Sequence, residues 1–203
     1  MPALEALLDR FAAVHTQPLG ISVDSIHCHA NWAESLGGIS FPLLADFHPK
    51  GGVAKAFGLY LEDVGITDRA TVIIDAGGIV RHVSSVTPAG ERDIAELAQL
   101  CEEIDAEYQG ELSSVTPLAE YSQDTTLYVR SRCGFSRNVL LARCNLHLED
   151  RIPVKNVSED SAAMAELLDI SGQEKAPCLV VDGKAMLESQ DIVKHLVSTR
   201  TGF

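Results

Sequence analysis

The chain has 203 residues, of which 46% are hydrophobic, and it carries a formal net charge of −13 at pH 7. This length can hold one large domain or two small domains with separate cores, and the acidic balance argues against binding to nucleic acid or anionic membranes. The charge is uneven, because residues 1–120 hold 18 of the 29 acidic residues but only 6 of the 16 basic ones. We therefore expect two units, of which the second alone can favour an anionic thiol.

Cysteine usage points to thiol chemistry and not to a disulfide scaffold. The five cysteines form no CxxC pair and no paired metal-ligand spacing; they are Cys28, Cys101, Cys133, Cys144 and Cys178. The sequence shows neither a signal peptide nor an apolar stretch of the roughly 20 residues that a membrane span needs. A reducing cytoplasm is the expected compartment, where exposed thiols serve redox reactions.

The first 108 residues alternate between helical and strand patterns, which predicts a mixed α/β domain. The expected elements are helices over 3–15, 25–36, 53–60 and 91–108, and strands over 18–24 and 69–75, with an apolar run at 41–45. The turn at 76–78 leads into residues 79–86 and predicts a hairpin. Cys101 falls on the apolar side of the last helix and is expected in the core.

Several motifs in this part resemble peroxiredoxins of the thiol-specific antioxidant family, over about residues 3–108. They are Leu19 to Ser25 (LGISVDS), His29, Trp32, Phe41 to Asp46 (FPLLAD), Arg69, and Val72 to Asp75 followed by Arg81. The resemblance implies that Arg69 corresponds to the arginine that lies against the peroxidatic thiolate. In the family that thiolate precedes the helix with which this sequence starts. We therefore expect an incomplete thioredoxin-like module whose exposed strand edges and apolar faces are covered by a partner or in a homodimer.

Three explanations for the incomplete module stay open: a truncated gene product, a start codon set too far downstream, or a partner chain that supplies the strands. A peroxidase activity would need an upstream cysteine. Cys28 corresponds to a helix position where some peroxiredoxins carry a resolving thiol, and without the first cysteine we expect a spare thiol. Because Cys28 and its two flanking histidines cannot all face one metal ion on a helix, no zinc site is predicted.

Residues 111–124 are predicted to form a linker between a first domain at 1–110 and a second at 125–203. The prediction rests on glycine, serine and proline residues in and next to this stretch, which interrupt helices and strands. The second domain is expected to contain strands over 127–129, 152–157, 179–181 and 184–187, and helices over 136–144, 161–170 and from Glu188-Ser189 onward. Asp182-Gly183 between two apolar runs predicts a tight hairpin turn.

Cys133 is expected at a strand-to-helix junction. A thiol in this place lies near the positive end of the helix dipole and between Arg132 and Arg137, and both fields favour the thiolate. The alternative is a buried structural cysteine, but the flanking glycine, serine and arginine residues are not typical of a buried core position. Cys144 lies deep in the same helix and cannot pair with Cys133.

Cys133-Gly134-Phe135-Ser136 is similar to the active site of monothiol glutaredoxins, and residues 125–200 follow the order of elements in that fold. The resemblance implies that Cys133 is the catalytic nucleophile, that glutathione is the co-substrate, and that glutathionylated proteins are partners. It also implies a cis peptide bond before the proline and glutathione contacts from Arg132, Phe135, Ala176, Pro177, Glu188 and Ser189. A helix N-terminus at Ser189 can hold a carboxylate, or Ser189 is a plain helix cap. Cys178 is either a resolving thiol or a small buried residue.

A glutathione-ligated 2Fe-2S scaffold is the alternative that the same resemblance raises. The sequence departs from the iron–sulfur type at three places, where it has Arg130 and Arg132, Lys175-Ala176, and Leu187-Glu188. The overall prediction is an α/β protein of two thioredoxin-like modules that acts as a glutathione-dependent thiol–disulfide oxidoreductase in redox homeostasis. Natural peroxiredoxin–glutaredoxin hybrids use such a fusion, which gives the two modules a high effective concentration.

Overall fold

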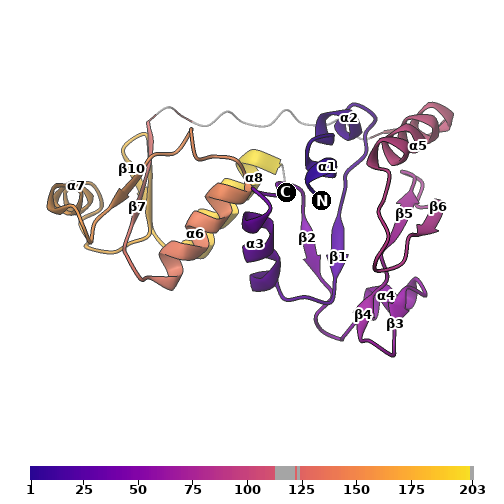
Figure 1. Cartoon of the computed structure of the whole chain (residues 1–203). Helices are drawn as coiled ribbons and strands as arrows, with labels where there is room; N and C mark the ends of the chain where they lie inside the picture. Colours follow the sequence, from indigo (N-terminus) through magenta and orange to yellow (C-terminus); the bar gives the residue numbers. More distant parts are fainter. Residues whose placement is uncertain (113–121, 123, 202–203) are drawn as a thin grey trace. The chain divides into compact units, whose positions relative to one another are not determined.

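The computed structural model describes residues 1–112, 122 and 124–201 (Figure 1). Its internal contacts form two compact units, one of Met1–His29 with Phe41–Val115 and one of Ala30–Ser40 with Thr116–Phe203. Helices and strands alternate in both units, so the predicted mixed α/β class is confirmed. Among the described residues, no helix is both long and apolar enough to cross a bilayer.

The helices within residues 1–112 are shorter than the hydrophobic pattern predicts, and most of the predicted linker at 111–124 lies outside the described residues. These helices are α1 (Pro2–Glu5), α2 (Leu8–Ala12), α3 (Ile26–Ser35), α4 (Gly52–Ala56) and α5 (Ile94–Glu107). The single helix expected over 3–15 is interrupted because Leu7 has φ −112° and ψ 11°, outside the helical region. The helix expected over 53–60 stops early, since Tyr60 belongs to a strand. Ser25, just before α3, caps this helix by accepting the Cys28 amide at 3.2 Å.

The strands of the first unit pair only two by two. They are β1 (Gly20–Ser22), β2 (Leu43–Ala45), β3 (Tyr60–Leu61), β4 (Ile66–Thr67), β5 (Ala70–Ile74) and β6 (Val80–Ser85). β1 and β2 are parallel, whereas β3–β4 and the predicted hairpin β5–β6 are antiparallel. Each strand therefore has one free edge within the part of the chain that the structure describes.

The core of the first unit is small. Its buried cluster consists of Phe11 from α2 with Ala98 and Cys101 from α5, and Cys101 is thus a core residue as predicted. None of the described residues in β1, β2, β5 or β6 is buried. Among the described residues, 18 large hydrophobic side chains are exposed, and 15 of them lie in residues 1–112. This confirms the expected exposure of apolar faces.

The second unit has one four-stranded sheet with helices on both faces. Its elements are β7 (Thr125–Val129), α6 (Gly134–Asn145), β8 (Val154–Asn156), α7 (Ser161–Ser171), β9 (Cys178–Val181), β10 (Lys184–Met186) and α8 (Ser189–Thr201). The strand order is β10-β9-β7-β8, with β7 parallel to β8 and antiparallel to β9. This is the arrangement of a thioredoxin-like domain.

Successive side chains of β7 point to opposite faces of the sheet and so contribute to the hydrophobic clusters on both faces. Leu127 packs with residues of α6 and α8, whereas Tyr128, on the opposite face, packs with Leu167 of α7. The β9–β10 hairpin turns at Asp182 (φ 49°) and Gly183 (φ 73°), the left-handed pair typical of a tight two-residue turn. The predicted hairpin is therefore confirmed.

Candidate functional site

Cys133 stands directly before α6, at the end of the loop that follows β7. The helix begins at Gly134, two residues earlier than predicted, so Cys133 is the N-cap residue with extended backbone angles (φ −106°, ψ 119°). Its side chain is partly exposed, in contrast to the buried Cys101 and Cys178. The strand-to-helix location is thus confirmed, and the alternative of a buried structural cysteine is not.

Amide groups at the start of α6 lower the pKa of the Cys133 thiol. The largest contribution comes from the Ser136 backbone N–H; the Ser136 hydroxyl and the Phe135 N–H add to it, and partial burial opposes them. The guanidinium of Arg130 contributes a smaller attraction. The thiolate is therefore favoured mainly by helix N–H donors and less by a guanidinium. That guanidinium belongs to Arg130, whereas the sequence predicted the fields of Arg132 and Arg137.

Ser136 is a site residue whose role the sequence analysis missed. It is 1% exposed, and its Oγ accepts the backbone N–H of Arg130 at 3.0 Å. Because that acceptor contact orients the hydroxyl, its proton is available for the Cys133 sulfur. The only sequence signal was its position three residues after Cys133, on the same side of the helix.

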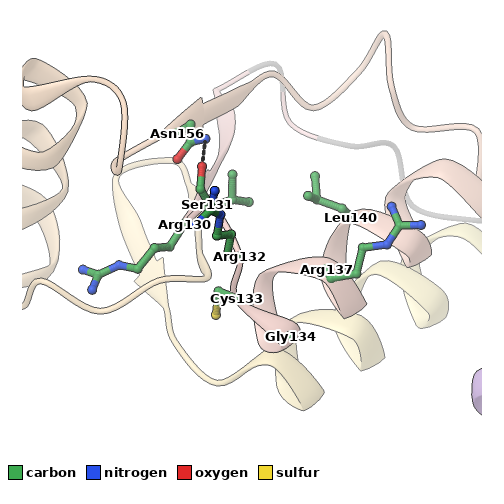
Figure 2. Close-up of a pocket in the computed structure, with 9 residues that line it drawn as sticks. Arg130, Ser131, Arg132, Cys133, Gly134, Arg137, Leu140 and Asn156 are labelled. Atoms are coloured by element: carbon green, nitrogen blue, oxygen red, sulfur yellow. Dashed lines mark hydrogen bonds between the residues drawn. The ribbon is translucent and has the colours of Figure 1, made fainter.

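A hollow of about 540 Å³ adjoins Cys133, and we call it the arginine hollow (Figure 2). It is lined by Val129, Arg130, Ser131, Arg132, Cys133, Gly134, Arg137, Leu140 and Asn156. The β7–α6 loop forms most of it, and β8 adds Asn156, whose Nδ2 donates to Ser131 Oγ at 2.8 Å. The result is a cationic surface beside the sulfur.

A second, smaller hollow of about 180 Å³ surrounds the cis-proline, and we call it the proline hollow. It is lined by Phe135, Lys175, Ala176, Pro177, Leu187, Glu188 and Ser189. Five of the six residues expected to contact glutathione meet here, and the peptide bond before Pro177 is cis as predicted. Arg132 is the exception, since it lines the arginine hollow. Lys175 and Leu187 are lining residues that the sequence analysis did not name as contacts.

The proline hollow includes the N-terminus of α8. Glu188 has a left-handed backbone (φ 70°) and its carbonyl accepts the amides of Asp191 and Ile192. Within the described residues, the amides of Ser189 and Gln190 have no acceptor. Such free N–H groups at a helix start can bind a carboxylate.

Of the two further cysteines of the second unit, Cys178 is buried and Cys144 is partly exposed. Cys178 is 0% exposed at the start of β9, and burial raises the pKa of its thiol. Burial also raises the pKa of the Cys144 thiol in α6. A raised pKa disfavours the thiolate, so Cys178 fits the description of a small buried residue better than that of a resolving thiol.

Arg69 and Cys28, the two residues assigned from the peroxiredoxin resemblance, have separate neighbours. The exposed Arg69 donates from Nη1 to the Gly90 carbonyl at 3.1 Å. The exposed Cys28 donates from Sγ to Asp24 Oδ1 at 3.8 Å. No hydrogen bond joins the two among the residues that the structure covers. Within that same part of the chain, no group of three histidine, cysteine or acidic residues could hold a metal ion.

Two family models match the chain in its two parts. Residues 1–83 match the AhpC/TSA family, and residues 127–202 match the glutathione S-transferase N-terminal domain. The first match covers the region with the peroxiredoxin motifs. The second covers β7 to α8 and therefore includes both hollows and Cys133.

Curated relatives and solved structures each match about half of the chain or less. Alkyl hydroperoxide reductase E of Mycobacterium bovis is 38% identical over 86 residues, which is 42% of this chain and 56% of that protein. Peroxiredoxin-4 of Bos taurus is 39% identical over 83 residues, 38% of this chain and 30% of the relative. The solved Mycobacterium tuberculosis AhpC is 30% identical, with a TM-score of 0.46 over 50% of this chain and 60% of that one. This chain thus spans about half or less of its curated relatives. It joins an N-terminal peroxiredoxin-like region of the AhpC/TSA type to a C-terminal thioredoxin-like domain of the glutathione S-transferase N-terminal type.

Proposed function

We propose that the chain is a glutathione-dependent thiol–disulfide oxidoreductase whose nucleophile is Cys133. One observation carries the proposal: a partly exposed thiol with a lowered pKa lies at the N-terminus of α6. The neighbouring proline hollow offers a cis-proline and a free helix N-terminus for a peptide with a carboxylate. The family match to a glutathione S-transferase N-terminal domain supports the choice of glutathione.

The reaction has two exchange steps. The Cys133 thiolate attacks the glutathione sulfur of a mixed disulfide, so that a bond forms between these sulfurs and the partner cysteine leaves as a thiolate. A second glutathione thiolate then attacks the glutathione sulfur on Cys133. This step releases oxidised glutathione and restores the Cys133 thiolate. One enzyme thiol suffices, so a serine at position 136 is compatible with the cycle.

The proline hollow is assigned to glutathione in both steps. Ser189 and the first amides of α8 would bind the α-carboxylate of the γ-glutamyl end, while the backbone around Pro177 would pair with the peptide. Phe135 is 67% exposed and offers an apolar surface beside the tripeptide. These contacts would hold the glutathione sulfur next to Cys133, which lowers the entropic cost of attack.

The test measures release of glutathione from a glutathionylated protein, coupled to reduction of oxidised glutathione. The comparison is between the wild type, Cys133→Ser, and Ser189→Ala as a binding variant. We expect no turnover with Cys133→Ser and a raised KM for glutathione with Ser189→Ala. Equal rates for wild type and Cys133→Ser would contradict the proposal.

The peroxiredoxin-like region suggests that peroxide stress supplies the substrates. Its exposed apolar side chains, Val80 and Val83 on β6 among them, support a homodimer through this half. Sedimentation of the wild type and Val83→Glu tests the dimer, since a charge on this strand should favour the monomer. Peroxide consumption with glutathione as the reductant tests a peroxidase role of the full chain.

The 2Fe-2S scaffold is the competing proposal for the same thiol. It requires Cys133 as a ligand and glutathione as a further thiolate donor. Anaerobic purification followed by a visible absorption spectrum distinguishes the two. A brown dimer that loses its colour in Cys133→Ser would favour the cluster, and a colourless active protein would favour the oxidoreductase.

A further inference from the structure

We propose that the arginine hollow binds an acidic stretch of the glutathionylated polypeptide, next to its disulfide-bonded cysteine. The inference rests on the proposed function and names the class of substrate that the same site selects. Figure 2 draws the residues that line this hollow, with Cys133 among them.

The two hollows divide the reactive surface between the two halves of a mixed disulfide. They share no lining residue, and Cys133 itself lines the arginine hollow. When glutathione fills the proline hollow, the polypeptide that carries the leaving cysteine must lie over the remaining surface around Cys133. The larger hollow, about 540 Å³, is part of that surface.

The lining of the arginine hollow is cationic although the whole chain carries a charge of −13. Arg132 is exposed, and it has no hydrogen-bond or ion-pair partner among the residues that the structure describes. Arg130 is held by its Nη2 bond to the Glu174 carbonyl at 3.0 Å, and Arg137 pairs with Glu34. Arg132 is therefore the guanidinium available to a carboxylate from outside.

A hydrogen-bond network fixes the loop that presents Arg132. Ser131 accepts from Asn156 Nδ2 at 2.8 Å, and its own Oγ donates to Glu159 Oε1 at 2.7 Å. Its backbone N–H donates to Ser158 Oγ at 3.1 Å. Since the loop is already ordered, binding does not bear the full cost of organising it.

Polypeptide is favoured over a simple anion because the hollow is not purely polar. Val129 and Leu140 line it beside the arginines. An acidic side chain could reach Arg132 while the aliphatic parts of its neighbours contact these two residues. The chemistry that fits is therefore an Asp or Glu within a peptide segment.

Two synthetic peptides test the inference. Each carries one glutathionylated cysteine, flanked by Asp and Glu in the first and by Asn and Gln in the second. For the wild type we expect a KM about fivefold lower for the acidic peptide at low salt, the scale of a surface charge pair. The preference should shrink as salt is raised, because the charges are exposed.

Arg132→Ser should remove the preference by raising the KM for the acidic peptide alone. Arg151→Ser is the matched control, since it deletes the same charge at an exposed position that lines neither hollow; it should keep the preference. If Arg132→Ser raises both KM values equally, Arg132 serves glutathione and the proposal is wrong. A wild type that treats the two peptides alike overturns it as well.

A binding measurement separates failure of this inference from failure of the proposed function. Fluorescence anisotropy of the labelled peptides is measured on Cys133→Ser, where no turnover occurs. The wild type could prove inactive while the acidic peptide still binds about fivefold more tightly in an Arg132-dependent manner. This result would support the binding role of the arginine hollow and contradict only the proposed reaction. If neither turnover nor preferential binding is seen, both are wrong.

Discussion

The two central strands of the second unit, β7 and β9, bury most of their side chains, whereas no strand of the first unit contains a buried residue. In β7, four of the five residues are buried, on both faces of a four-stranded sheet. In β5, which carries a similar run of β-branched residues, none is buried, and within the described part of the chain the strand pairs with β6 alone. Similar strand sequences thus reach different burial because the number of covering layers differs.

This difference in packing suits the two units to different roles. The second unit can hold Cys133 in a defined environment because packed elements fix both ends of its loop. The first unit presents apolar side chains and open strand edges, which natural proteins normally cover with another chain or element. Under the proposed function, the second unit therefore supplies the catalytic thiol and the first unit supplies the surface for association.

Removing one partly or fully exposed thiol from each unit should give the largest difference in activity between the two variants. Cys133→Ser is expected to lower the rate of glutathione release at least about a hundredfold, because it removes the nucleophile. Cys28→Ser removes an exposed thiol of the first unit and should leave the rate unchanged. A strong loss with Cys28→Ser would show that the two units share the chemistry.

Truncating one apolar side chain in a strand of each unit should cost the second unit more unfolding free energy than the first. Leu127→Ala, at a position that is 0% exposed, is expected to cost about 2–5 kcal/mol of unfolding free energy in the second unit. Ile21→Ala, at a position that is 40% exposed in β1, should cost less than about 1 kcal/mol. Hydrogen exchange resolved by peptide measures each unit separately, and similar costs would contradict the comparison.

Ser136→Ala tests how the second unit favours the thiolate. Loss of the hydroxyl donor should raise the pKa of Cys133, so the midpoint of iodoacetamide alkylation against pH moves upward. At pH 6 we expect alkylation to slow by about three- to tenfold, the scale of the net contribution of one typical hydrogen bond. Ser136→Thr keeps a hydroxyl and should restore the profile, and Ser198→Ala on the surface of α8 is the control. An unchanged midpoint would remove Ser136 from the site.

The smallest effect is expected for an acidic residue of the first unit. Asp46 accepts the amides of Ala54 (3.0 Å) and Val53 (3.1 Å), and the Ala54 bond is the main cause of its lowered pKa. Its stabilisation is complete above the unfolded pKa of about 3.9 and is lost as pH falls through the lower folded value. In Asp46→Asn, the free energy of unfolding should therefore fall less steeply as the pH is lowered. Asp63→Asn, at an exposed turn position, should keep the pH dependence of the wild type. The check is circular dichroism between pH 2 and 6.

The sequence determined the elements whose signals lie within a few residues. The breaker pattern at Asp182-Gly183, the apolar stripe of α5 and the turn before α6 each depend on local backbone preferences, so the hairpin, the core position of Cys101 and the placement of Cys133 could be predicted. The lengths of α1, α2 and α4 could not, because short helices depend on tertiary packing more than on propensity.

Only the tertiary structure decided which residues share a hollow. Phe135 and Pro177 are 42 positions apart in the sequence and meet beside Ser189, whereas Arg132, three positions from Phe135, lines a different surface. The hydroxyl of Ser136 likewise gains its role from the Arg130 amide at the end of β7. Helix and strand patterns specify local direction, but the meeting of side chains distant in the sequence depends on how the sheet brings its loops together.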